Sequence, residues 1–310
     1  MKKNKPRIKV IGVGGSGSNA ITRMAKCRIP GVELIVMNTD AQNLKYASAD
    51  LKIQLGKKVT QGLGTGMNFK LGREAAKESK EEVTGILKGS DMVFITCGLG
   101  GGTGTGASPI VADIAVQEGI LTVAVVTRPF SFEGAFRNNI AKAGLRKLRE
   151  RVDSLISISN DKLLSTLDPN TSLISAFWAC DDILRQAVQE ISDLILLPGI
   201  INVDFADVKA VLKNSGTALF GIGTAKGSKR AEEASLRAIN SPLLDISYKG
   251  AKGILFNISG GKDISLSEID EIAKVITREI NSEAKVIFGA VQSEKLNKGE
   301  IKVAIIATGF

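Results

Sequence analysis

The chain has 310 residues, of which 44% are hydrophobic, so it is long enough to form two domains with well-buried cores. It contains 41 basic and 32 acidic residues, a formal charge of +9, and we expect this excess to be scattered over the surface. Aromatic residues make up 5%, which argues against a surface that stacks nucleic-acid bases. Histidine is absent, which excludes Ser–His and Cys–His catalysis and removes the commonest metal ligand.

The cysteines, Cys27, Cys97 and Cys180, show no short spacing, which argues against a disulfide framework or a zinc site. The apolar run at residues 8–13 breaks into glycines too soon for a signal peptide. No segment approaches the uninterrupted apolar length of a membrane span. We therefore expect the reducing cytoplasm as the compartment.

Short apolar runs rich in β-branched residues alternate with helix-like segments through the first 160 residues. The strand-like runs are residues 8–13, 32–37, 92–96, 121–126 and 155–158, and the helix-like segments include residues 18–26, 69–80 and 141–151. This alternation predicts a doubly wound parallel sheet, an α/β fold. Ligands of such sheets bind beyond the carboxyl ends of the strands.

The pattern changes at residue 172, where apolar residues keep helical spacing as far as residue 196 before Pro198 and Gly199 end the helix. Beyond it, strand-like runs at 218–223, 253–258, 284–290 and 302–307 alternate with helix-like segments at 229–240 and 265–281. We predict a nucleotide-binding domain at residues 1–171, a central linking helix at 172–200 and a smaller α/β domain at 201–310.

A glycine-rich run at residues 98–109 follows a buried-strand pattern and precedes a helix-like segment at 109–117. Glycine lets consecutive backbone N–H groups face one point, and a helix N-terminus adds partial positive charge. We expect this run to hold a polyphosphate through the backbone of its glycines and the hydroxyls of its threonines. These residues are Gly101, Gly102, Thr103, Gly104, Thr105 and Gly106.

A second glycine loop, at residues 12–17, fits G-x-G-x-x-G, and Asp40 follows about 20 residues later, as in a dinucleotide-binding protein. Taken alone, this pattern is compatible with a nicotinamide- or flavin-dependent oxidoreductase. Such an enzyme needs one pyrophosphate cradle, whereas here two loops reach the same sheet edge. A mononucleotide triphosphate would use both loops, so we favour that ligand.

The run at residues 98–109 lacks the Lys-Ser/Thr of a Walker loop and resembles the tubulin signature in the form of the bacterial FtsZ family. The resemblance extends over residues 8–310, including the Phe-Glu-Gly turn at 132–134 and Asn-Val-Asp-Phe-Ala-Asp at 202–207. It implies a GTPase that binds GTP and GDP with Mg²⁺ and polymerises head to tail.

The resemblance also implies a cellular role, that of the cell-division ring protein at the division site of a bacterial cytoplasm. Its partners would be further copies of itself and regulators of the division ring. No nucleic-acid partner is expected, and a membrane would be reached only indirectly or through the basic surface.

The resemblance assigns roles to single residues. Gly14 and Gly15 would lie against the nucleotide, and Asn19 would contact the base. Glu133 and Arg137 would hold the ribose and phosphates; without the resemblance, they predict a surface salt bridge. The guanine pocket would be formed by Phe177, Asp181 and Asn160. Spacing alone would instead favour a core phenylalanine and a helix-capping carboxylate.

The acidic loop, Asn202, Asp204 and Asp207, combines groups suited to orienting a water molecule. The alternative is that Asp204 caps a helix beginning near residue 206. A helix of about 25 residues spans nearly 40 Å, so these groups should act on the nucleotide of the next molecule in a filament. By the resemblance, Gln42 is a contact on the metal side.

Two further alternatives remain at this stage. The family normally continues into a linker and a docking peptide, so a chain ending at Phe310 is either trimmed or a tailless paralogue with a specialised filament role. A GTP-binding module without hydrolysis would lack the acidic loop. Because Asp204 and Asp207 are present, we disfavour it.

Overall fold

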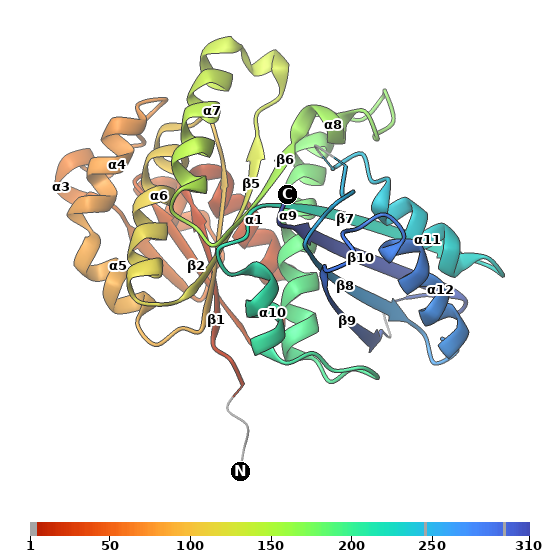
Figure 1. Cartoon of the computed structure of the whole chain (residues 1–310). Coiled ribbons are helices and arrows are strands. Elements are labelled where there is room, and N and C mark those ends of the chain that lie inside the picture. The colour runs from red at the N-terminus through yellow and green to blue at the C-terminus, as the bar shows by residue number, and fades with distance from the viewer. Residues whose placement is uncertain (1–4, 245–246, 294–295) are drawn as a thin grey trace. The chain divides into compact units, whose positions relative to one another are not determined.

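The computed structural model describes residues 5–244, 247–293 and 296–310 (Figure 1). The chain divides into two compact units, Met1–Gln189 and Glu190–Phe310, which we call unit 1 and unit 2. The boundary falls inside the longest helix, α9 (Leu173–Leu196). The three-part division made from the sequence remains a prediction.

Unit 1 is built on a sheet whose neighbouring strands are parallel, in the order β3-β2-β1-β4-β5-β6. The strands are β1 (Ile8–Val13), β2 (Val32–Asn38), β3 (Leu51–Gln54), β4 (Met92–Gly98), β5 (Leu121–Arg128) and β6 (Ser154–Ser159). This confirms the doubly wound sheet. The strand order changes direction between β1 and β4, and this switch point is where such sheets bind ligands.

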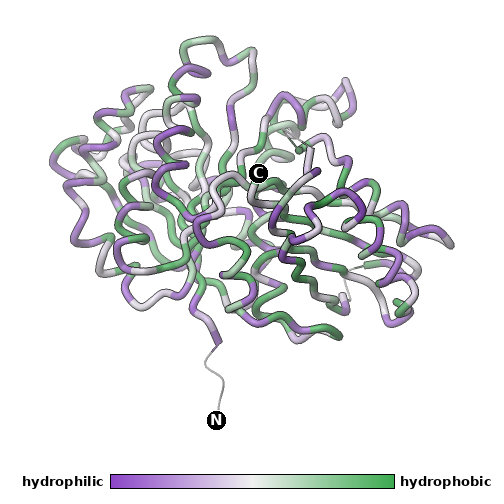
Figure 2. Tube along the Cα trace, viewed as in Figure 1, coloured by the Kyte–Doolittle hydropathy of each residue, from purple (hydrophilic) through white to green (hydrophobic). Residues whose placement is uncertain are grey.

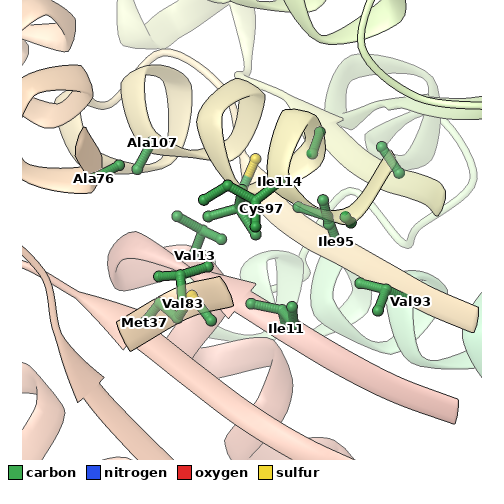
Figure 3. Close-up of a cluster of buried hydrophobic side chains, with 14 of the residues drawn as sticks. Ile11, Val13, Met37, Ala76, Val83, Val93, Ile95, Cys97, Ala107 and Ile114 are labelled. Carbon is green, nitrogen blue, oxygen red and sulfur yellow. The ribbon is translucent and has the colours of Figure 1, made fainter. Parts of the chain in front are cut away.

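The helices of unit 1 are α1 (Gly14–Cys27), α2 (Ala41–Tyr46), α3 (Lys57–Thr60), α4 (Phe69–Glu78), α5 (Lys80–Leu87), α6 (Gly102–Gln117), α7 (Ala135–Arg149) and α8 (Asn160–Leu164), with a 3₁₀ turn η1 at Ser131–Glu133. Helices α4, α5 and α7 each pack against α6. Their apolar faces meet β1, β2 and β4 in a core that includes Val13, Met37, Cys97 and Ile114 (Figure 3). The hydropathy trace shows apolar strands and covering helices of mixed character (Figure 2).

The glycine run that we expected to be a loop is partly helical, because α6 begins at Gly102 rather than at Pro109. The reason is close packing. A Cβ on Gly102 would lie 2.3 Å from Thr65 Oγ1, and one on Gly106 would lie 2.1 Å from the Phe69 carbonyl oxygen. These glycines let the first turns of α6 lie directly against α4 and the segment before it.

Unit 2 contains β7 (Gly216–Lys226), β8 (Gly253–Gly260), β9 (Lys285–Gln292) and β10 (Glu300–Thr308) in the order β7-β10-β8-β9. Strand β10 is antiparallel to both neighbours, and β8 and β9 are parallel. Its helices are α10 (Phe205–Leu212), α11 (Arg230–Ile239) and α12 (Leu266–Thr277). Helices α11 and α12 cover an apolar core that includes Ile254, Phe256 and Ile272. No helix among the described residues is long and apolar enough to cross a membrane.

Candidate nucleotide-binding site

The two glycine loops meet at the switch point of the unit 1 sheet. Gly14 has φ +74°, and a Cβ on it would lie 2.8 Å from the backbone nitrogen of Gly104. A Cβ on Gly104 would be 3.0 Å from the carbonyl oxygen of Gly98. Only glycine allows this contact between the turn after β1 and the first turn of α6.

The outward side of the same loops is open. No atom of the described residues lies within 4 Å of a Cβ placed on Gly15 or Gly101. Helices α1 and α6 both begin here, and neither has a side-chain cap at its N-terminus. At the start of α6 the Gly102 N–H is already bonded to the Gly66 carbonyl at 2.7 Å. An anion would therefore meet the other uncapped N–H groups at the two helix starts, and the helix dipoles also favour it there. The arrangement fits a polyphosphate.

The threonine hydroxyls of the run have partners inside the protein. Thr103 Oγ1 lies 2.8 Å from Thr39 Oγ1 and 2.9 Å from Thr65 Oγ1. Thr105 Oγ1 accepts a hydrogen bond of 2.9 Å from the Gly100 N–H. These bonds hold the loop in shape. Sequence reasoning treated both threonines as phosphate donors and did not identify Thr39 or Thr65.

Glu133 and Arg137 form an ion pair at the start of α7, with 3.1 Å between Glu133 Oε2 and Arg137 Nη1. The other carboxylate oxygen accepts a hydrogen bond from the Phe130 N–H at 2.8 Å. Arg137 Nε is buried and has no hydrogen-bond partner among the described residues. A Cβ on Gly100 would touch Arg137 Cγ at 2.8 Å, so the pair adjoins the loop after β4. A buried donor without a partner is the kind of group that a ligand phosphate would satisfy.

The end of the candidate site at which the base is predicted to bind is formed by residues of α1, α8 and the first turns of α9. Asp181 is 7% exposed, and its Oδ2 is 3.2 Å from Arg23 Nε. Burial raises the pKa of Asp181 to about 6, and the Arg23 charge opposes this rise. Asn160 is 5% exposed, and its Oδ1 has no partner among the described residues. These groups suit a polar ring bound edge-on.

Two aromatic contacts border this end. The ring of Phe177 meets Phe130 edge to face at 5.4 Å and stays 39% exposed, so it is not the core residue that spacing alone would favour. The Arg23 guanidinium lies 4.5 Å from the ring centroid of Trp178. Sequence reasoning missed Arg23, although it lies one helical turn after the exposed Asn19 on α1.

Asp40, the acidic residue of the dinucleotide pattern, caps α2. Its Oδ1 accepts hydrogen bonds from the backbone N–H groups of Gln42, at 2.9 Å, and Asn43, at 3.0 Å. The Gln42 side chain is exposed. Among the described residues, no three His, Cys, Asp or Glu side chains are grouped as metal ligands. A metal ion here would take most of its oxygen ligands from phosphates and water, as Mg²⁺ commonly does.

The acidic loop belongs to unit 2. Asn202 Oδ1 accepts a hydrogen bond of 2.8 Å from the Gly199 N–H, and Asp204 Oδ1 caps α10 by accepting one of 3.0 Å from the Ala206 N–H. The capping alternative is therefore confirmed for Asp204, which keeps a second oxygen. Asp207, in the first turn of α10, is exposed and has no side-chain partner among the described residues. The backbone N–H groups of Ile200 and Ile201 bond to the Ala290 carbonyl and tie the loop to β9.

A parallel sheet in the order β3-β2-β1-β4-β5-β6, with two glycine-rich helix N-termini at its switch point, defines a nucleotide-binding α/β protein. Residues 7–168 match the GTPase domain of the tubulin/FtsZ family, and residues 216–310 match the C-terminal domain of the FtsZ family. The chain belongs to the tubulin/FtsZ family and is a GTPase. This confirms the resemblance and excludes the oxidoreductase alternative.

Solved structures agree with this assignment. An empty FtsZ dimer from M. jannaschii is 47% identical, with 99% of this chain and 89% of that chain covered and a TM-score of 0.95. CetZ2 from Haloferax volcanii, solved as a GTPγS-bound protofilament, is 21% identical, with coverage of 97% and 92% and a TM-score of 0.81, and shares the fold. A bacterial source remains a prediction.

Proposed function

We propose that this GTPase assembles head to tail into filaments and that the acidic loop of one subunit completes the GTP site of the next. The observation that carries this proposal is Asp207, an exposed carboxylate with no partner among the described residues, on a loop that is tied to β9. The M. jannaschii relative was solved as a dimer and the Haloferax volcanii relative as a protofilament, which supports assembly. The division site of the cell is the proposed location.

The nucleotide would be bound within unit 1. The backbone of Gly14 and Gly15 and of the run from Gly101 to Gly106 would surround the phosphates with N–H donors, apart from the Gly102 N–H, which bonds to the Gly66 carbonyl. The Nε of Arg137, which has no partner among the described residues, would donate to a phosphate oxygen, and Glu133 would accept from ribose hydroxyls.

Guanine recognition would rest on two acceptors and a ring. Ionised Asp181 can accept from two N–H groups of guanine, which adenine does not offer, and the free Asn160 Oδ1 is a further acceptor. The exposed face of Phe177 would stack on the base, and Asn19 on α1 would contact its edge. The pocket would therefore select guanine over adenine.

Hydrolysis would proceed by attack of water on the γ-phosphate. Mg²⁺ bound to the phosphates would neutralise developing charge, with Gln42 as the contact from the protein. Asp207 of the neighbouring subunit would accept a hydrogen bond from the attacking water and orient it. Asn202 and the second carboxylate oxygen of Asp204 would complete the set of polar groups around the water. One side-chain oxygen of each residue accepts a backbone N–H bond and so fixes the conformation of the loop.

The test measures GTP turnover per molecule against protein concentration, with light scattering on the same samples. Turnover should appear only above the concentration at which filaments form. Asp207→Ala should abolish turnover and leave assembly intact, while Glu271→Ala, which removes an exposed carboxylate from α12 of unit 2, should leave both intact. Turnover that is independent of concentration would show that one chain holds the whole active site, and the shared-site proposal would then be wrong.

A further inference from the structure

The charge of the chain is unevenly divided. Residues 1–189 contain 26 basic and 17 acidic side chains, whereas residues 190–310 contain 15 of each. The whole formal excess of +9 therefore belongs to unit 1. The formal excess is therefore not shared evenly between the two units.

Helix α7 concentrates this charge, because it carries five basic residues and no acidic residue over Ala135–Arg149. Its buried face consists of Ile140, Ala141, Gly144 and Leu148. At about 100° per residue, Lys142, Arg146 and Arg149 fall together on the opposite side. All three are exposed. We call these three residues the α7 stripe.

The α7 stripe adjoins one acidic residue in sequence, Glu150 at the carboxyl end of α7, but no ion pair joins the stripe to it. None of its three side chains has an ion-pair or hydrogen-bond partner among the described residues. On neighbouring α4 the situation differs, since Arg73 and Lys77 both pair with Glu74. The stripe extends about 10 Å along the helix at 1.5 Å per residue. Within the described part of the chain, it is a straight row of unpaired cations.

We propose that the α7 stripe docks unit 1 on an anionic lipid surface. Charge complementarity is the argument: fixed cations in a row match headgroups that diffuse laterally to meet them, and each basic residue near such a surface strengthens binding about fivefold. A nucleic-acid partner fits less well, because the chain is only 5% aromatic and stacking would contribute little.

Attachment by three cations is weak for one subunit and strong for an array. A filament repeats the stripe in every subunit, so the contacts add as a multivalent interaction. This step rests on the proposed assembly, whereas the stripe itself does not. Assembly would thus control attachment: filaments bind the surface, and dispersed subunits leave it.

The experiment is co-sedimentation of the full chain with vesicles of phosphatidylcholine, with and without phosphatidylserine, in GDP and in a slowly hydrolysed GTP analogue. Binding should require phosphatidylserine, increase with the analogue and weaken with salt. The variant Lys142→Gln/Arg146→Gln/Arg149→Gln should lower per-subunit partitioning roughly a hundredfold. Its GTP turnover and assembly in solution should be unchanged, because none of the three residues lies in the candidate site.

The matched control is Lys213→Gln/Lys262→Gln/Lys285→Gln, which removes the same charge from exposed lysines of unit 2. It should bind vesicles as the parent does. Equal loss in both variants would show a general charge effect and overturn the proposal. The proposal would also be overturned by filaments that bind vesicles equally well with and without phosphatidylserine. A stripe variant that loses only DNA binding or only the lateral pairing of filaments would overturn it as well. If the parent chain does not assemble, the proposed function is wrong. The α7 stripe can still be tested in that case, by comparing the vesicle binding of the two variants in GDP.

Discussion

Arg23 on α1 and Asp181 on α9 form a partly buried ion pair, with 3.2 Å between Arg23 Nε and Asp181 Oδ2. The pair lies beside Phe177, which belongs to the proposed base pocket. Burial raises the pKa of Asp181 from 3.8 to about 6 in spite of this partner. Because the folded pKa is the higher one, the ionised carboxylate lowers stability at neutral pH, by about 3 kcal/mol. The protein thus holds a charge that folding alone would disfavour.

The selectivity for guanine should consequently depend on pH. Above pH 6 Asp181 is ionised and, in the proposed pocket, would accept two N–H bonds from guanine. As the pH falls through 6, Asp181 takes up a proton and loses one acceptor position. The affinity ratio of GDP to IDP, which lacks the 2-amino group, should decrease over this range. The ratio cancels the titration of the phosphates, which the two nucleotides share. It can be measured by isothermal calorimetry.

Arg23→Met provides the control for this prediction. Removing the cation should raise the pKa of Asp181 further, so the fall in selectivity should move to higher pH by roughly one unit. Lys26→Met, on the exposed last turn of α1, should leave the curve in place. A selectivity ratio that stays flat between pH 5 and pH 8 would contradict the assignment of Asp181 to the base.

The contact between the two glycine loops should be intolerant of a single methyl group. Gly14→Ala forces φ +74° on an alanine and places its Cβ 2.8 Å from Gly104 N. We expect a loss of about 2 kcal/mol in the free energy of unfolding, together with weaker GDP binding. Urea titration and nucleotide binding on the same preparation measure both.

Gly85→Ala is the matched change outside the site. Gly85 lies in α5 and is exposed, and a Cβ added to it would have no atom of the described chain within 4 Å. Alanine there should stabilise the protein by about 0.5–1 kcal/mol and leave nucleotide binding unchanged. If Gly14→Ala and Gly85→Ala behave alike, the close contact between the loops has no energetic role.

Much of unit 1 could be predicted because its buried parallel strands are continuous apolar runs. Strand β1 begins and ends at the predicted residues, 8 and 13. Strand β3 was missed, since only Ile53 of its four residues is buried and the pattern is too short to recognise. Helix α7 begins at Ala135, six residues before the predicted start, because no residue of its first turn is fully buried and its buried apolar face begins only at Ile140.

The parts of the candidate site that lie at the ends of strands could be predicted from the sequence. The contacts that depend on how distant segments pack together could not. The glycine loops had to meet because they leave adjacent strands, β1 and β4, at their carboxyl ends. The contact of Arg23 with Asp181 joins α1 to α9, residues distant in sequence, and no local pattern reports it. The internal partners of Thr103 likewise depend on how the segments around Thr39 and Thr65 approach α6.

A shared active site should be restored by mixing two inactive variants. Asp207→Ala keeps the nucleotide pocket, and Asp181→Ala keeps the acidic loop while losing guanine recognition. Each alone should hydrolyse GTP poorly. In a mixture, some junctions combine an intact pocket with an intact loop, so turnover should reappear on mixing. Absence of recovery, with both chains found in the same filaments, would place the catalytic groups within one subunit.

Unit 2 contains a buried ion pair, and a double-mutant cycle can measure the coupling energy between its two partners. Glu190 on α9 is 4% exposed; its carboxylate accepts hydrogen bonds from Lys302 Nζ on β10 and, at 3.0 Å, from Asn257 Nδ2 on β8. Lys302→Met alone would leave the carboxylate buried without its cation and should cost about 3–5 kcal/mol of unfolding free energy.

Glu190→Leu combined with Lys302→Met removes both charges, and the double variant should recover most of that loss. Urea unfolding of the parent, both single variants and the double variant measures the coupling energy. Exposed Lys274, which pairs with Asp270 on the surface of α12, is the matched control, and Lys274→Met should change stability by less than about 1 kcal/mol. If Lys302→Met costs no more than Lys274→Met, the buried pair does not fix the carboxyl-terminal turns of α9 to the sheet of unit 2.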